Sequence, residues 1–284
     1  MMISRLQRSW RDYVDVVVAV AVSRLKITSR YPGYLLVDVS LPIMFAAVPI
    51  LLGRSMAGPG GGQAFAGNTG TANYVAYMLI GSNVFMIVSG ALWNIGFWIR
   101  REQQTGTLEA LYLAPVSRFW ILAGVALYGT VRNLLALAVS FTVGCLLFGI
   151  NPVQGDILIA LGFLLLGVVP LYGVSLLYGA LVLRLKEANA MIQIAQWLVS
   201  LLMGIFFPVA VLPPLLRWLA LAFPPTWMNN GVRAALLDVG WFFDTWYADF
   251  AVLGAFAVFV PVVGYAIFRR MERGLLRGEG IGTF

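Results

Sequence analysis

Long apolar runs alternate with short polar segments along most of this 284-residue chain. A helix needs roughly 20 apolar residues to cross the hydrocarbon layer of a membrane, and several runs reach or exceed that length. In lipid such a helix satisfies all of its own backbone hydrogen bonds. The pattern predicts an all-α integral membrane protein with six transmembrane helices, at residues 34–53, 73–99, 119–150, 157–183, 190–212 and 248–268.

Residues 1–30 form a separate class of segment because charges interrupt their apolar positions. Val14, Val17, Val18 and Ala21 fall at helical spacing, whereas the neighbouring charges lie elsewhere on the helical wheel. The uninterrupted apolar part is too short to cross a membrane. We expect an amphipathic helix on the cytoplasmic membrane surface. The alternative is an ordinary N-terminal helix packed on protein.

Residues 213–247 contain two short helical patterns, at 215–223 and 226–239, separated by Pro224-Pro225. Neither pattern is long enough to span, so the segment predicts an external re-entrant or interfacial helical hairpin before the last span. Four tryptophans in or beside it fit the aromatic belt of a membrane interface. A second external segment, residues 54–71, is rich in glycine and is expected to be a flexible loop. It lacks the Lys-Ser/Thr ending of a phosphate-binding loop.

Composition supports the membrane class and excludes several kinds of chemistry. Hydrophobic residues make up 61% of the chain and charged residues only 11%, where a soluble domain has about a quarter charged. The absence of histidine removes a histidine base and histidine metal ligands. No motif for binding nucleotide phosphates is present. We therefore expect no catalytic site, no metal and no cofactor bound by this chain.

The net charge of +7 is distributed unevenly over the predicted loops, which favours the positive-inside rule over binding of nucleic acid. With both termini in the cytoplasm, the outer segments hold only Arg54, Arg217 and Arg233. The count predicts a multi-pass plasma-membrane protein whose inner segments carry Arg5, Arg8, Arg11, Arg24, Lys26, Arg30, Arg100, Arg101, Arg118, Arg184, Lys186, Arg269, Arg270, Arg273 and Arg277.

Residues 100–118 are the longest polar interruption between two strongly apolar segments. Thr105 or Thr107 can cap the start of a helix, and Pro115 ends it. Leu108, Leu111 and Tyr112 would share one face of that helix. A helix of about two turns is unstable alone in water and needs a surface to pack on. That surface is either the ends of this protein's own helices or a groove on another protein.

The same residues carry a family resemblance. The run from Glu102 through Thr105-Gly106-Thr107-Leu108-Glu109 to Leu113-Ala114-Pro115-Val116-Ser117-Arg118 resembles the signature of ABC-2 type transporter permeases, the membrane subunits of ABC exporters that include the daunorubicin-resistance type. The resemblance extends over the whole order of predicted elements. It implies a pair of permeases, here a homodimer, with two separate ATP-binding subunits that hold ATP and Mg.

The resemblance also implies roles for individual residues. A coupling helix between spans two and three would enter a cleft on each ATPase, with Thr107, Leu108, Glu109, Leu111 and Tyr112 as docking residues. Arg101 and Glu102 would pass its motion into span two. A smaller cytoplasmic contact is implied for Arg184, Lys186 and Glu187.

Arg132 lies about 20 Å into the third predicted span, near the middle of the membrane. A charge at that depth costs a few kcal/mol unless it faces a cavity or a partner. Three environments remain open: the substrate pathway or dimer seam, a structural partner within the subunit, and lipid. Asp38 is expected to be interfacial.

The leading hypothesis is the transmembrane subunit of an ATP-driven exporter that moves a drug-like molecule, a lipid or a lipid-linked glycan out of the cytoplasm. An ATP-independent channel or secondary transporter would need ion-coupling carboxylates at mid-membrane, and the sequence offers none there. A non-transporting membrane scaffold is the third possibility.

Overall fold

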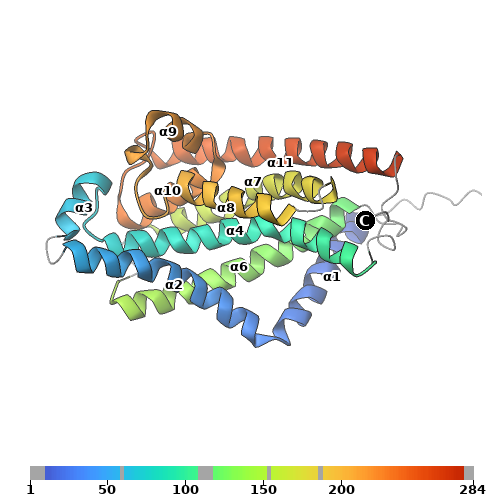
Figure 1. The fold of residues 1–284 in the computed structure, drawn as a ribbon, viewed down its shortest axis with the longest axis horizontal. Coiled ribbons are helices and arrows are strands. Elements are labelled where there is room, and N and C mark those ends of the chain that lie inside the picture. The colour runs from blue at the N-terminus through green and yellow to red at the C-terminus, as the bar shows by residue number, and fades with distance from the viewer. Residues whose placement is uncertain (1–9, 58–60, 108–117, 152–154, 185–187, 278–284) are drawn as a thin grey trace, which may run out of the picture.

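Long helices run lengthwise through the molecule and make up nearly all of its regular structure (Figure 1). The computed structural model describes residues 10–57, 61–107, 118–151, 155–184 and 188–277, and no strand occurs among them. The elements are α1 (Trp10–Ser29), α2 (Pro32–Ala57), α3 (Gly61–Thr69), α4 (Tyr74–Gln104), α6 (Arg118–Phe148), α7 (Ile157–Arg184), α8 (Ala188–Leu202), the 3₁₀ turn η2 (Val209–Val211), α9 (Pro214–Leu221), α10 (Pro224–Leu237) and α11 (Trp246–Arg277).

Five helices among the described residues are long and apolar enough to cross a membrane, namely α2, α4, α6, α7 and α11. The chain is therefore a multi-pass membrane protein. α4 is the most enclosed of the five and packs against α2, α6, α7 and α10. Its inner faces join α7, α8 and α10 in the main apolar core. The start of α1, the end of α4 and the end of α11 gather at one end of the bundle, and α3 and α9 lie at the other (Figure 1).

The predicted continuous span over residues 190–212 is wrong. α8 ends at Leu202, and Gly204 adopts a positive φ of 60°, which glycine favours just beyond a helix end. Residues 203–208 are not helical, and only the short turn η2 lies between them and α9. The 15 residues of α8 measure about 22 Å, less than the hydrocarbon thickness of about 30 Å.

α10 compensates for the break at the end of α8. The last carbonyls of any helix lack partners within that helix, and in an apolar interior each needs a donor. α10 is buried against α4, α7 and α11, and one polar face of it covers the end of α8. Four consecutive carbonyls receive side-chain donors from this face: Leu202 from Thr226, Met203 from Asn229, and both Gly204 and Ile205 from Arg233.

Two corrections follow from this packing. Arg233 is not a cation of an outer segment, because its side chain is buried in the core. The glycine-rich segment is not wholly a loop either. Residues 61–69 form α3, and Phe65 packs edge-on against Tyr74 and Tyr77 of α4 with ring centroids 6.1 and 5.3 Å apart. These aromatic contacts hold the short helix in place.

Glycines allow the long helices to approach closely. A Cβ atom on Gly264 of α11 would collide with the backbone of Gly173 on α7, whereas a Cβ on Gly254 of the same helix would meet nothing within 4 Å. Small residues at helix contacts are a general means of packing in membranes. The tightest part of the α7–α11 contact therefore depends on Gly173 and Gly264.

We expect Gly264→Ala to destabilise the purified protein by about 1–3 kcal/mol, because the added methyl group must push two backbones apart. Thermal unfolding in detergent measures the effect, and Gly254→Ala is the control on the same helix. Equal unfolding temperatures for the two variants would contradict the close contact seen at Gly264.

Candidate functional site

The C-terminal end of α4 is closed by the Thr105-Gly106-Thr107 sequence. Gly106 has a φ of 69°, and the backbone N–H of Thr107 donates to the carbonyl of Glu102 at 3.1 Å. This is the hydrogen bond of a Schellman motif. The hydroxyl of Thr105 donates to the carbonyl of Arg101 at 2.9 Å. The described hydrogen bonds of these threonines thus belong to the end of α4. The prediction that Thr105 or Thr107 caps the start of a following helix concerns residues 108–117, which lie outside the described ranges.

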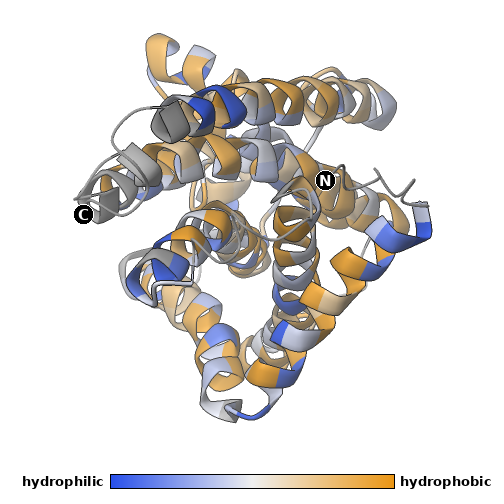
Figure 2. Ribbon diagram, turned by 90° about the vertical axis from the view of Figure 1, so that its right-hand side faces the viewer, coloured by the Kyte–Doolittle hydropathy of each residue, from blue (hydrophilic) through white to orange (hydrophobic). Residues whose placement is uncertain are grey.

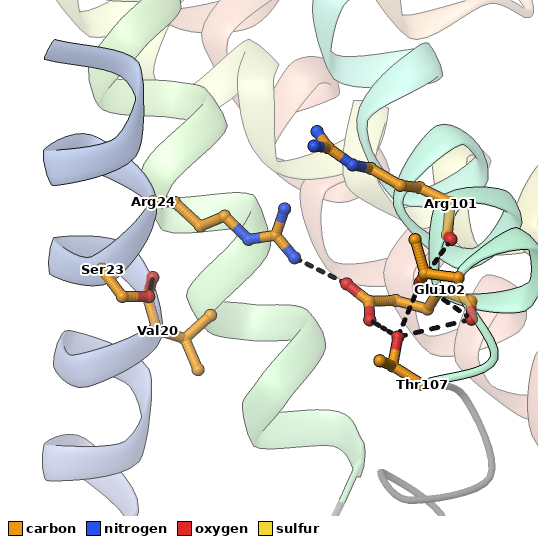
Figure 3. Close-up of polar contacts among 7 residues, drawn as sticks. Val20, Ser23, Arg24, Arg101, Glu102 and Thr107 are labelled. Atoms are coloured by element: carbon orange, nitrogen blue, oxygen red, sulfur yellow. Dashed lines mark hydrogen bonds and ion pairs between the residues drawn. The ribbon is translucent and has the colours of Figure 1, made fainter. Parts of the chain in front are cut away.

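The carboxylate of Glu102 joins three parts of the chain. One of its oxygens accepts a hydrogen bond from the Arg24 guanidinium of α1 at 2.7 Å, and the other accepts the hydroxyl of Thr107 (Figure 3). The Arg24 and Glu102 side chains are 26% and 14% exposed. Partial burial strengthens such a charge-assisted bond relative to an exposed ion pair. α1, the end of α4 and the first residues after it are therefore linked through one carboxylate.

α1 is held in turn by α6. Tyr13 stacks on Trp120 with centroids 5.1 Å apart, and Gly124 lets the α6 backbone lie close to Val20. Farther along, the hydroxyls of Thr28 and Tyr128 are hydrogen-bonded. These contacts pack α1 firmly against α6. The helix that carries Arg24 is therefore held in place by α6.

The opposite face of α1 remains apolar and exposed at Val14, Val18 and Val22. One face of α1 is thus packed on protein, as the alternative prediction held. The other offers the apolar stripe that the membrane-surface prediction requires.

A cavity of about 580 Å³ lies between α1, α2, α4 and α6, with Gln196 of α8 on one side. Figure 2, which looks along the bundle, shows that hydrophobic residues dominate its helices. The volume falls within the range of about 300–1,000 Å³ that small-molecule sites occupy. Two hydrogen bonds to α4 hold the Gln196 side chain in place: it accepts from the Trp93 indole at 2.9 Å and donates to the Ser89 hydroxyl at 3.1 Å.

Arg132 of α6 lies in the wall of this cavity and is paired with Asp38 of α2. Its Nε and Nη2 atoms lie 2.7 and 2.6 Å from Oδ2 of Asp38. The sequence left a partner within the subunit and a place on the substrate pathway as open alternatives. The structure shows the partner within the subunit, and it also places the pair on the cavity surface.

The comparison with family models gives a match between residues 17–237 and the ABC-2 type transporter model. The match covers more than half of the chain. The chain belongs to the ABC-2 type transporter family. No individually curated protein matches it significantly.

As an ABC-2 transporter, the chain is a membrane permease of an ABC-type transporter. The matched region begins within α1 and ends with α10. It therefore contains the cavity and the contacts of Glu102 with Arg24 and Thr107, called the Glu102 junction below. The predicted coupling stretch lies inside it as well.

The structure describes only part of the predicted ABC-2 coupling site. It brings Glu102 and Thr107 together and places Arg101 on the cavity lining. The side chain of Arg184, at the end of α7, lies outside the described part. The other predicted contact residues lie wholly outside the described ranges: Leu108, Glu109, Leu111, Tyr112, Lys186 and Glu187.

Sequence reasoning missed Arg24 and the true position of Asp38. For Asp38 a signal existed, since an arginine deep in a span requires a partner and Asp38 is a carboxylate inside another span. For Arg24 the signal was weaker, because many cations share the same end of the protein.

Proposed function

We propose that this ABC-2 permease is the membrane subunit of an ATP-driven exporter that moves an amphipathic or hydrophobic molecule out of the cytoplasm. The observation that carries the proposal is the Glu102 junction, which ties the start of the coupling stretch directly to α1 and α4. A movement imposed on residues 108–117 would reach two helices through one carboxylate. The distribution of cations supports a cytoplasmic position for this end of the bundle.

In this proposal a partner protein supplies the energy by hydrolysing ATP. The chain has no sequence motif that would bind nucleotide phosphates, so ATP and Mg would be held by a separate ABC ATP-binding subunit. Two such subunits and a second copy of the permease complete the assembly that the family resemblance implies. The daunorubicin-resistance subtype and the homodimer are part of the same proposal.

The transport cycle follows from linkage between the two proteins. ATP binding can shift the permease only if the ATPase contacts differ between its two conformations. A docking helix on residues 108–117 would transmit that difference, because Thr107 is bonded to Glu102 and Glu102 is bonded to Arg24. Because α1 packs on α6, a movement passed through Glu102 would reach α4, α1 and α6 together.

The docking surface can be tested by co-expressing the permease with a candidate ABC ATP-binding protein and purifying the complex. Glu109→Ala/Leu111→Ala removes the anion and the apolar contact expected at the start of the docking helix. We expect association to fall at least about tenfold, equivalent to about 1.4 kcal/mol, with a parallel loss of transport-coupled ATP hydrolysis.

Leu215→Ala/Arg217→Ala is the matched control, since both side chains are exposed on α9 at the other end of the bundle (Figure 1). The control should associate normally. Failure of the wild-type permease to bind any ATP-binding subunit, or full coupled transport by the Glu109/Leu111 variant, would overturn the proposed function.

A further inference from the structure

We infer that the cavity inside a single permease subunit is a binding site for an amphipathic organic anion. The assignment of that ligand class to the exported substrate rests on the proposed function, whereas the existence of the site does not. The argument depends on the composition of the cavity wall, on its balance of charge and on two buried amides.

The wall is long and partly aromatic. Lining residues on α4 extend from Asn83 to Arg101, a rise of about 27 Å along a helix. Trp93 and Phe97 stack on each other with centroids 4.4 Å apart, and half of the Phe97 side chain is exposed. Lining leucine, isoleucine and methionine side chains continue the apolar surface beyond this aromatic pair. A ligand with an apolar body fits this wall.

The cationic side chains outnumber the acidic ones. Arg24, Arg101 and Arg132 line the cavity, and Asp38 is its single acidic lining residue among the described positions. Asp38 neutralises Arg132, and Glu102 at the rim neutralises Arg24. Three cations against these two carboxylates leave an excess of one positive charge. An anionic group on the ligand would balance that excess.

Arg101 is the residue at which the anion would bind. It follows Trp98 and Phe97 on α4, so a charge at Arg101 lies directly beside the aromatic wall. Figure 3 shows the Arg101 side chain extending on the same side of α4 as the ion pair between Arg24 of α1 and Glu102. Arginine suits carboxylate and phosphate oxygens because its planar group donates two parallel hydrogen bonds. The ligand would thus lie with its charged end at the Arg101 end of the cavity.

The other end of the cavity holds two incompletely bonded amides. Oδ1 of Asn83 and Nδ2 of Asn133 are buried and have no hydrogen-bond partner among the described residues. Both side chains line the cavity. Leaving a buried polar atom without a partner is unfavourable, so this region favours a ligand polar group or water over plain hydrocarbon. This end of the cavity would therefore hold water or a second polar group of the ligand.

The test uses the full-length permease in nanodiscs of phosphatidylcholine, without any ATPase. The probe is dodecanoic acid bearing a diazirine, and its methyl ester is the uncharged match. After irradiation, peptide mass spectrometry locates the labelled residues. We expect saturable labelling of cavity residues on α4 and α6 by the acid, at least about fivefold above the ester, and competition by unlabelled dodecanoate.

Two variants sharpen the result. Ala136→Trp fills the cavity from α6 and should abolish cavity labelling, whereas Leu135→Trp, at a neighbouring position that is 57% exposed and does not line the cavity, should not. Arg101→Gln should reduce labelling by the acid about fivefold and leave the ester unchanged, because a single exposed-rim charge contributes about 1 kcal/mol.

Equal labelling by acid and ester, labelling only at lipid-facing positions, or unchanged cavity labelling in Ala136→Trp would overturn the site. Loss of the site with normal ATPase association would leave the proposed function standing. Binding of the acid by a permease that never associates with an ATPase would leave the site standing and overturn the proposed function.

Discussion

Arg233→Met is expected to cause the largest loss of stability of any substitution considered for this protein, about 3–5 kcal/mol. The arginine is buried, donates to the carbonyls of Gly204 at 2.8 Å and of Ile205, and lies 3.6 Å above the Tyr77 ring. It also donates to the carbonyl of Tyr77 at 3.1–3.2 Å. Methionine has similar length but no donor, so the carbonyls at the end of α8 would be left buried and unpaired at about 1–3 kcal/mol each.

The yield of monodisperse protein and its unfolding temperature in detergent measure the effect. Arg217→Met is the control, because Arg217 is exposed on the neighbouring α9. The unfolding temperature of Arg233→Lys should lie between those of Arg233→Met and Arg217→Met. A single ammonium group cannot reach all the carbonyls to which the planar guanidinium donates. Wild-type stability in Arg233→Met would show that the α8 end does not depend on this side chain.

The long spans were predicted closely because their signal is local. The predicted ranges 119–150 and 157–183 became α6 (Arg118–Phe148) and α7 (Ile157–Arg184). Uninterrupted apolar length is enough to specify a membrane helix, since lipid leaves the backbone no other partner. The glycine contacts of α7 with its neighbours also agree with the packing that small residues predict.

The end of α8 could not be predicted in the same way. Its helix stops where side chains from α10, more than 20 residues later, supply the missing donors. The local signals, Gly204 and Pro208, were present but also occur inside spans that continue, such as α7 with Pro170. Tertiary contacts decide between the two outcomes.

The sequence singled out residues 100–118 but contained no sign of the pairings around them. The structure adds that Glu102 meets Arg24, 78 residues earlier. Asp38 and Arg132 are 94 residues apart. No periodicity connects such partners. Matching each buried charge with an opposite charge in another span would have narrowed the choices for Asp38, but not for Arg24.

The second large effect is expected on coupling rather than on stability. Thr107→Val removes the hydroxyl that donates to Glu102, and Arg24→Gln removes the ion pair from α1 to the same carboxylate. We expect each to lower ATP-driven transport about tenfold in proteoliposomes containing the complex, since a charge-assisted bond of this kind contributes about 1.5–3 kcal/mol. ATPase association should persist in Arg24→Gln, because Arg24 is not among the predicted docking residues. Thr107 is one of them, so association is measured for Thr107→Val as well, and a loss of association there would assign its effect to docking.

Comparing the double variant with the two single variants reveals whether the links act in series. If movement passes from Thr107 through Glu102 to Arg24, breaking either link interrupts the same path, and Thr107→Val/Arg24→Gln should transport no worse than either single variant. Two independent contributions would instead multiply to about a hundredfold loss.

Ser23→Ala is the control on α1, because its hydroxyl bonds only to the carbonyl of Val20 among the described contacts (Figure 3). A multiplicative loss, or wild-type transport in both single variants, would contradict the proposal that Glu102 connects the coupling stretch with α1.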